Sequence, residues 1–412
     1  MHPATALLLC LLANPVAVRG EVQEPGAPAV PIEVTRVGDR ILVLDCLDVN
    51  VTAIATARGI VIVDTGRSPG LMEAIARRIE QEFGRRDVRY VIGTHAHPDH
   101  SAGNQVFPEA LIVSHRNGPA SMRRGRADTP GARRYVRDRI EKARAQLASA
   151  DPEEARRARA EIPARELMLA DLQGRYAVTP ATLTFSDRCS LDLGDVRLEL
   201  SACGRAHSDS DILVYVPGEK VLLSGDLFCG PDNTCFAVSP LVDVPGLASR
   251  IERVLDDPAG LETVIPGHGP LLTRADLIRL LGGMRERYAG FDGRRSAAAT
   301  LDTMIAAVGV DQALARLVPP APGGKDPTYF SEEEFDALAE SYRSVGRLSE
   351  AIRVLAHVCP FFTGSTLLLD SLGEACEEAG DIPSAISSYE KSLALSPSNR
   401  RIADRLKMLR PR

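Results

Sequence analysis

The chain has 412 residues, of which 44% are hydrophobic and 25% charged, a composition that is ordinary for a globular protein of two or three domains. Its formal net charge of −6 provides no general basic field for nucleic acid. It has no Trp and only 4% aromatic residues, which argues against stacking platforms for bases, so we expect no nucleic-acid partner.

The N-terminus carries an apolar run, Ala6–Ala13, followed by Asn-Pro and small residues. This pattern is typical of the core of a secretory signal peptide with cleavage near Ala17 or Gly20. We therefore predict a signal peptide at residues 1–20 and a periplasmic or secreted protein. The alternative is an apolar tail on a cytoplasmic protein. No other run reaches the roughly 18 apolar residues that a membrane helix needs, so no membrane span is expected.

Short strands and helices follow in a mixed order. Strands are predicted at 41–46, 51–57, 60–64, 88–93, 111–114, 196–201, 212–216 and 220–225, and helices at about 71–83, 245–256 and 273–287. Strands that run as hairpins occur together with strands that alternate with helices. This mixture predicts a layered α/β sandwich rather than a purely doubly wound sheet.

Residues 120–172 interrupt that pattern with a stretch rich in Arg, Ala and Glu. The stretch predicts two inserted helices, at about 131–148 and 152–172. One interpretation is a basic lid that attracts anionic substrates. The favoured interpretation is a solvated helical hairpin with ion pairs between residues four apart.

The C-terminal region begins after a linker marked by Pro319, Pro320, Pro322, Gly323 and Gly324. The pairs Leu338/Leu372, Gly346/Gly380 and Ala351/Ala385 are each separated by 34 residues, and this period resembles tetratricopeptide repeats. We therefore predict a helical linker at 291–328 and repeats at 331–400. Two units are too few for an independent stack, so they are expected to pack on a neighbour. Two interpretations stay open, a surface for a protein partner or self-association and a helical cap on the preceding domain.

Five of the eight histidines and two aspartates lie in short motifs. The residues are His95, His97, Asp99 and His100 in T-H-A-H-P-D-H, His207 in G-R-A-H-S-D-S-D, Asp226 in L-L-S-G-D, and His268 in P-G-H-G. Imidazole and carboxylate groups in this number can hold two divalent cations, most readily Zn²⁺, with Fe or Mn as alternatives. Two adjacent cations can bind one water between them and remove a proton from it near neutral pH. The motifs therefore predict a hydrolytic site.

Each motif follows a predicted strand or lies in a loop between strands, where catalytic groups commonly gather on a rigid scaffold. The T-H-A-H-P-D-H loop can direct His95 and His97 to one metal and Asp99 and His100 to the other. Gly225 is expected to let the chain turn tightly before Asp226. The remaining histidines, His2, His115 and His357, have no such setting and are interpreted as bystanders.

The order of these motifs resembles that of the metallo-β-lactamase fold superfamily, with Asp64 in V-I-V-D-T-G as the early aspartate. The resemblance covers about residues 32–290 and implies an αββα sandwich with the site at one edge. It implies that His95, His97 and His207 hold the first metal and that Asp99, His100 and His268 hold the second. It also implies that Asp226 bridges the metals and that Asp64 orients a ligand. Asp211 matches a further family position, although Ser210 replaces the family's glycine.

We therefore expect an exported dinuclear-metal hydrolase in which a metal-bridging hydroxide attacks an ester, thioester, lactone or amide bond of a small molecule. Asp99 would orient the hydroxide and relay a proton to the leaving group. One alternative is a β-lactamase in the narrow sense, although members of that group usually carry Cys or Ser where Asp226 stands. A second alternative is a non-enzymatic adaptor that acts through its repeats.

The loop at 228–245 contains Cys229 and Cys235, six residues apart in a segment rich in Gly, Pro and Asn. In an oxidising compartment these two cysteines could close a small disulfide ring.

Overall fold

The computed structural model describes residues 17–22, 30–149, 151–236, 238, 241–291, 293–320, 328–344 and 346–409. The apolar run Ala6–Ala13 of the predicted signal peptide lies outside these residues, and so do residues 321–327 of the predicted linker. Among the helices that are described, none is both long and apolar enough to cross a bilayer.

The first β-sheet contains the N-terminal strands in sequence order. Its strands are β1 (Ala17–Val22), β2 (Val30–Val37), β3 (Ile41–Asp45), β4 (Asn50–Thr56), β5 (Gly59–Val63), β6 (Val88–Ile92), β7 (Leu111–His115) and β8 (Leu183–Phe185). Pairing is antiparallel from β1 to β5 and parallel from β5 to β8. Along β5, Val61 and Val63 belong to one core and Ile60 and Ile62 to another, because successive side chains point to opposite faces.

The second β-sheet has the strand order β16-β15-β12-β11-β10-β9. Its strands are β9 (Arg188–Asp192), β10 (Arg197–Ala202), β11 (Ile212–Val216), β12 (Val221–Gly225), β15 (Thr263–Pro266) and β16 (Leu272–Thr273). Only the β12–β15 pair in this order is parallel. As a result, β12 and β15 deliver their carboxyl ends to the same edge of the sheet.

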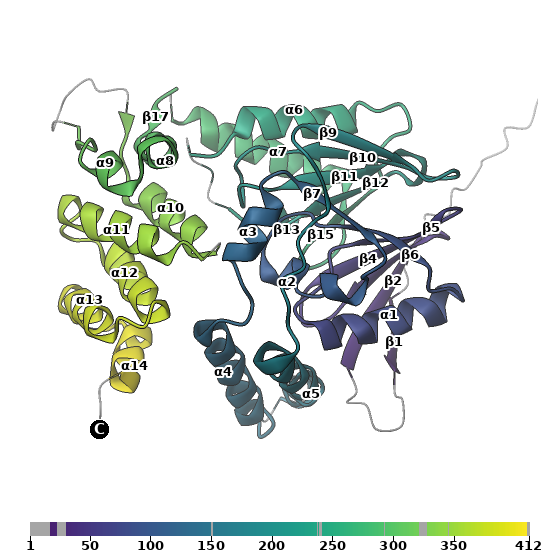
Figure 1. Cartoon of the computed structure of the whole chain (residues 1–412), viewed down its shortest axis with the longest axis horizontal. Helices are drawn as coiled ribbons and strands as arrows, with labels where there is room; N and C mark the ends of the chain where they lie inside the picture. The colour runs from purple at the N-terminus through teal and green to yellow at the C-terminus, as the bar shows by residue number, and fades with distance from the viewer. Residues whose placement is uncertain are drawn as a thin grey trace, which may run out of the picture.

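The two sheets pack face to face with helices on both outer faces, which gives four layers (Figure 1). The inner core joins β-strands of both sheets, because Val61 and Ile92 of the first belong to the same buried cluster as Val214 and Leu223 of the second. Helix α1 (Pro69–Phe83) covers the first sheet, and α6 (Val244–Leu255) and α7 (Arg274–Ala289) cover the second. The predicted αββα sandwich is confirmed.

Short elements complete this sandwich. They are α2 (Pro98–Ser101), η1 (Asn104–Val106), α3 (Gly118–Arg124), η2 (Pro217–Glu219), and the hairpin of β13 (Phe228–Gly230) and β14 (Asn233–Thr234). Cys229 and Cys235 lie in and beside this hairpin as free thiols.

The C-terminal region is helical apart from β17 (Arg295–Ser296) and β18 (Thr328–Tyr329), which pair in parallel. Its helices are α8 (Ala297–Val308), α9 (Val310–Leu314), α10 (Glu332–Ser344), α11 (Leu348–Val358), η3 (Cys359–Phe361), α12 (Thr366–Glu378), α13 (Ile382–Leu395) and α14 (Arg400–Leu409). Figure 1 shows these helices stacked along one side of the sandwich.

The predicted 34-residue repeat corresponds to the helix pairs α10–α11 and α12–α13. Ala351 and Ala385, at equivalent positions, are both fully buried, and Leu338 is buried in the same core as Ala351. That core also includes α8, α9 and Leu241 of the sandwich. The repeats therefore pack on a neighbour, as expected for so few units.

The inserted segment forms α4 (Pro130–Gln146) and α5 (Pro152–Gly174). It carries some of the expected ion pairs, such as Arg165 with Glu161, but it is not a freely solvated hairpin. Val136 of α4 and Met168 of α5 are buried in the same core as α1 and the first sheet. The expectation of a solvated hairpin is thus only half right, because one face of each helix is part of the domain core.

Asp171 joins the insertion to the sandwich. Its carboxylate is buried and accepts hydrogen bonds from Ser68 Oγ and the Gly70 amide, both at 2.7 Å. These donors lie at the first turn of α1, where the backbone N–H groups of a helix lack partners within the helix. Asp171 therefore completes the N-terminus of α1 from a helix a hundred residues away.

Replacing Asp171 with Ala is expected to lower the free energy of unfolding by about 3 kcal/mol, because two buried donors lose a charged acceptor. Urea denaturation would measure this loss, with Asp171→Asn losing less and Asp138→Ala on the exposed face of α4 losing almost nothing. A loss for Asp171→Ala no larger than that for Asp138→Ala would show that this contact does not hold the insertion in place.

Candidate metal centre

All the residues singled out from the sequence gather where strands of the two sheets end. Strand β6 leads to His95 and His97, and α2 then carries Asp99 and His100. Asp64 follows β5, Asp226 follows β12, and His268 follows β15, while His207 lies between β10 and β11. These positions converge because β5 and β6 are parallel in one sheet and β12 and β15 are parallel in the other.

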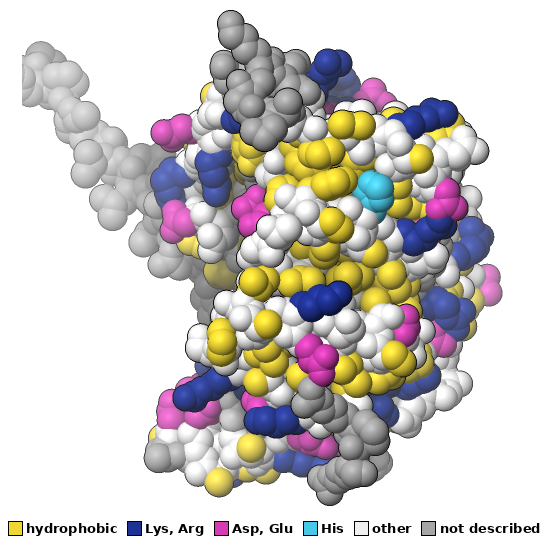
Figure 2. Space-filling view, turned by 90° about the vertical axis from the view of Figure 1, so that its left-hand side faces the viewer, with side chains coloured by type: hydrophobic (Ala, Val, Ile, Leu, Met, Phe, Trp, Pro, Cys, Tyr) yellow, Lys and Arg dark blue, Asp and Glu magenta, His cyan; other side chains and the backbone are white. Residues whose placement is uncertain are grey.

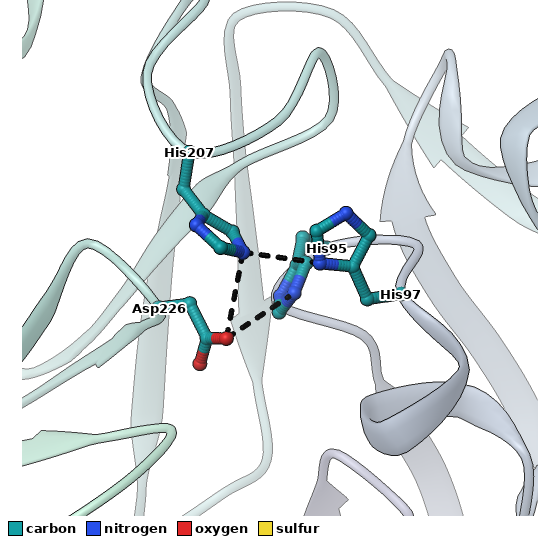
Figure 3. Close-up of side chains that lie close together, drawn as sticks. All are labelled: His95, His97, His207 and Asp226. Carbon is teal, nitrogen blue, oxygen red and sulfur yellow. Dashed lines mark hydrogen bonds and ion pairs between the residues drawn. The ribbon is translucent and has the colours of Figure 1, made fainter. Parts of the chain in front are cut away.

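The first group comprises His95, His97, His207 and Asp226, whose ligand atoms all lie within 4.8 Å of one another. Figure 3 shows the three imidazoles and the carboxylate pointing toward a common centre. His207 Nε2 lies 3.0 Å from His97 Nδ1. Asp226 Oδ2 lies 3.5 Å from His207 Nε2 and 3.7 Å from His95 Nε2.

The second group comprises Asp99, His100 and His268, again with ligand atoms within 4.8 Å. His100 Nε2 lies 3.2 Å from His268 Nε2, and His268 Nε2 lies 3.6 Å from Asp99 Oδ2. Asp226 contacts this group as well, because its Oδ1 lies 3.3 Å from His100 Nε2 and its Oδ2 lies 3.2 Å from His268 Nε2. Asp226 is therefore shared by the two groups.

The donor set fits two divalent cations. The buried atoms His95 Nε2 and Asp226 Oδ1 have no hydrogen-bond partner among the described residues. Buried polar atoms are normally satisfied, so unpaired atoms within these two groups of potential ligands call for an ion. Imidazole nitrogen with a minority of carboxylate oxygen suits Zn²⁺, and Fe or Mn also accept this set.

Asp64 and Thr94 hold two histidines of the T-H-A-H-P-D-H motif in place through hydrogen bonds. The Asp64 carboxylate is buried and lies 3.0 Å from His100 Nδ1, and it accepts hydrogen bonds from the Thr94 amide and hydroxyl, both at 2.8 Å. The Thr94 hydroxyl lies 3.1 Å from His95 Nδ1. One carboxylate thus fixes the ring of His100 directly and that of His95 through Thr94, as expected for groups around a metal site.

Two further potential ligands, His207 and His268, are oriented by backbone carbonyls. His207 Nδ1 lies 2.9 Å from the Cys235 carbonyl, next to the β13–β14 hairpin. His268 Nδ1 contacts the Asp48 carbonyl in the turn between β3 and β4. In both rings this leaves Nε2 to face the centre.

Asp211 acts on the backbone of the His207 loop rather than on the imidazole. It is buried and accepts hydrogen bonds from the Ser208 amide at 2.7 Å and the Ser208 hydroxyl at 2.6 Å. Ser210, the departure from the family pattern, is also buried, and its amide donates to the Ser208 hydroxyl. This closed turn holds His207 in place.

Two glycines make room for Asp226. Gly225 has φ +52°, a left-handed conformation that side chains disfavour, and this confirms the expected tight turn. At Gly267 an added Cβ would lie only 2.0 Å from Asp226 Oδ1. Any side chain at position 267 would therefore displace the shared carboxylate.

Burial and opposite charges divide the histidines into two electrostatic classes. Burial lowers the pKa of His97 to about 4, with a further decrease from neighbouring His207, and burial lowers the pKa of His95 well below its ordinary value. Burial also opposes a charge on His100, but the carboxylates of Asp226, Asp99 and Asp64 outweigh it and raise the pKa of His100 well above its ordinary value. His95 and His97 of the first group are therefore neutral near pH 7, whereas His100 of the second group retains a proton.

Arg67 is a site residue that the sequence motifs did not reveal. Its guanidinium lies 3.3 Å from Asp99 Oδ2, and its Nε donates to the Leu47 carbonyl. Burial alone would raise the pKa of Asp99, but the charges of His100 and Arg67 lower it to about 2. The only signal in the sequence is the position of Arg67 directly after D-T-G, in the same loop as Asp64.

The remaining histidines stand apart from both groups. His2 lies outside the described residues, His115 ends β7, and His357 lies in α11. Neither His115 nor His357 belongs to a cluster of potential ligands among the described residues.

Comparison with known proteins bears directly on this architecture. A sequence model of the Metallo-beta-lactamase superfamily matches residues 44–282, and one of the tetratricopeptide repeat matches residues 368–402. The metallo-beta-lactamase type 2 of Bacillus cereus is 25% identical over 226 residues, which are 55% of this chain and 69% of the relative. The protein of the same name from Bacillus sp. (strain 170) is 24% identical and covers 55% of this chain and 68% of its own length.

Solved structures with a similar arrangement include two from Pseudomonas. The metallo-beta-lactamase FIM-1 from Pseudomonas aeruginosa has a TM-score of 0.42 at 14% identity and covers 64% of this chain and 98% of its own. The sec-alkylsulfatase Pisa1 from Pseudomonas sp. has a TM-score of 0.43 at 17% identity and covers 91% of this chain and 61% of its own. Because the superfamily model spans more than half of the sequence, the chain belongs to the metallo-beta-lactamase superfamily and carries a tetratricopeptide repeat at its C-terminal end.

Proposed function

We propose that this protein is a hydrolase that uses two divalent metal ions, most readily Zn²⁺, to cleave an acyl bond of a small molecule. The observation that carries the proposal is the position of Asp226, whose carboxylate lies within 3.7 Å of ligand nitrogens in both groups. A carboxylate shared in this way can hold two cations side by side. Two adjacent cations supply a water that is activated near neutral pH and polarise the carbonyl under attack.

The residues around the centre would have different roles in binding the ions and orienting the water. His95, His97 and His207 would hold the first ion, Asp99, His100 and His268 the second, and Asp226 both. Asp64 would hold His100 in the orientation and tautomer that leave Nε2 free. Asp99, whose pKa is about 2, stays ionised and can accept a hydrogen bond from the attacking water. Its ionisation supports the orienting role more strongly than the proton relay expected from the sequence.

An ester, thioester, lactone or amide would suit such a site. Cleavage of a β-lactam amide is the second candidate, because both curated relatives carry the name metallo-beta-lactamase type 2. Zinc-loaded protein assayed against a panel of β-lactams, thioesters, lactones and aryl esters, with EDTA-treated protein as control, would distinguish these substrates. If protein with two bound ions hydrolysed none of these substrates, the result would contradict the acyl-bond proposal.

Export from the cytoplasm is part of the proposal and rests on the apolar run Ala6–Ala13 with small residues after it. A protein partner or self-association through the C-terminal helices is a further part, supported by the tetratricopeptide repeat match. Figure 2 shows the outer side of this region, where many apolar side chains lie among scattered charges.

Substitution of Asp226 by Ala should reduce metal content and hydrolysis together, because the groups would lose the one carboxylate they share. Loss of an outer residue around a metal typically costs 10–100-fold, so loss of this ligand should reduce kcat/KM by at least about 100-fold. Metal content by mass spectrometry and kcat/KM would be compared with those of Asp232→Ala, an exposed aspartate that belongs to neither group of potential ligands. Full activity with two bound ions in Asp226→Ala would reject the shared role.

The two groups should also load with zinc at different pH. His97, with its pKa lowered to about 4, needs to release no proton at pH 5.5, whereas His100, with its pKa raised, must lose a proton before it can bind metal. As the pH falls, the second group should therefore empty first, leaving about one zinc per chain near pH 5.5 and about two near pH 8.

Zinc content after dialysis at each pH would measure this loading. His268→Ala at pH 8 should match the unmodified protein at pH 5.5, because each lacks a working second group. Loss of both ions over the same pH range would contradict the division into two electrostatic classes.

A further inference from the structure

A small cavity of about 230 Å³ lies directly beside the first group of ligands, with His97 and His207 in its wall. Part of the wall comes from the sandwich and is apolar, with Phe236, Leu241 and Val242. Other parts of the wall come from the His207 loop and from helix α10 of the C-terminal region. The edge of the sandwich that carries the metal centre and the C-terminal helical region therefore line the same cavity.

Helix α10 contributes Ala337, Glu340 and Ser341 to that wall. Glu340 and Ser341 lie three and four residues after Ala337, so both are neighbours of Ala337 on one face of the helix. The same helix turns Leu338 and Ala339 into the helical core. Helix α10 thus packs into the stack of helices and also borders the cavity beside His97 and His207, and Ala337 lies at the edge between these two faces.

Polar contacts fix α10 at this position. Buried Glu334 accepts a hydrogen bond from the Leu241 amide at 2.9 Å. Arg205, two residues before His207, donates to Ser341 Oγ at 3.4 Å and pairs with Asp302 of α8. Tyr342 donates to the same carboxylate at 2.5 Å. The helix is therefore tied to the His207 loop and to the segment at 241.

The charges near the cavity have partners of their own. Arg205 pairs with Asp302, and Glu340 pairs with Arg343 at 2.7 Å. Each charge thus has an opposite charge beside it, and the other lining side chains of the sandwich are mostly apolar, with Ser208 as a polar exception. The volume is below the roughly 300–1,000 Å³ of pockets that take drug-sized ligands. The cavity is therefore suited to a short, uncharged, apolar group.

We propose that this cavity binds the short aliphatic acyl chain of the substrate, and that Ala337 on α10 and Phe236 on the sandwich set the chain length it accepts. The inference rests on the proposed function, because it places the reacting carbonyl at the metal centre and the chain beside His97 and His207. It assigns the C-terminal helices a direct role in substrate selection.

Binding of straight-chain carboxylates to zinc-loaded protein tests this proposal without relying on hydrolysis. Acetate, propionate, butyrate, hexanoate and octanoate would be titrated by saturation-transfer NMR and calorimetry. Affinity should rise about fourfold with each methylene that the cavity buries and then level off when the cavity is full. Equal affinity for all chain lengths, or no binding of any of them, would overturn the proposal.

Two variants should shift the limit in opposite directions. Ala337→Phe fills the cavity and should abolish the gain from acetate to butyrate while leaving acetate binding within about twofold. Phe236→Ala enlarges the cavity and should extend the rise to longer chains. Glu333→Phe adds the same ring one turn earlier on α10, at an exposed position, and should leave the whole series unchanged.

The outcomes separate this proposal from the proposed function. Chain-length selection that both variants shift, in a protein that hydrolyses no acyl substrate, would support the cavity and contradict the activity. Hydrolysis of acyl substrates, with a chain-length profile that neither Ala337→Phe nor Phe236→Ala changes, would support the activity and overturn the role of the cavity.

Discussion

The shared carboxylate of Asp226 is the interaction on which the centre depends. It lies between two clusters of imidazoles that come from both sheets, and it is nearly fully buried. A buried carboxylate needs compensating positive charge, so this position is costly without cations or protonated histidines nearby. The surrounding structure accommodates that demand, because Gly225 and Gly267 leave the space and the parallel pair β12–β15 sets the direction of approach. A change that moves Asp226 would therefore disturb both clusters at once.

The helical additions extend the sandwich around this centre in different ways. The insertion α4–α5 is bound to the first sheet by apolar packing and by the buried contact of Asp171 with the start of α1. The C-terminal helices border the cavity beside the centre through α10 and contact the insertion through the ion pair of Arg134 with Glu377. Because Glu377 is also held by Arg405 and by the Tyr389 hydroxyl, that ion pair belongs to a network rather than to an isolated surface contact. The substrate would thus meet parts of the chain that are distant in sequence.

Sequence patterns predicted the candidate ligand residues because only a few residue types, chiefly His and Asp here, have side chains that bind metal ions. His95, His97, Asp99, His100, His207, Asp226 and His268 all gather at one edge, and Asp64 lies against His100 as expected. The carbonyls of Cys235 and Asp48 could not be predicted, since every residue has a carbonyl and only the fold decides which one contacts an imidazole ring.

The approach of α10 to His97 and His207 was equally unpredictable. The 34-residue period identifies the helices, but tertiary contacts such as Glu334 with the Leu241 amide decide where they dock. The burial of the insertion was underestimated because its many charges obscure the apolar positions of Val136 and Met168.

Anomalous diffraction at the zinc edge, from crystals of zinc-loaded protein at pH 8, would test the central claim most directly. The account predicts two peaks, one among His95, His97 and His207 and one among Asp99, His100 and His268. Both peaks should lie at about 2.0–2.2 Å from an oxygen of Asp226. A single peak, or two peaks of which Asp226 coordinates only one, would contradict the claim that this carboxylate joins the two halves of the centre.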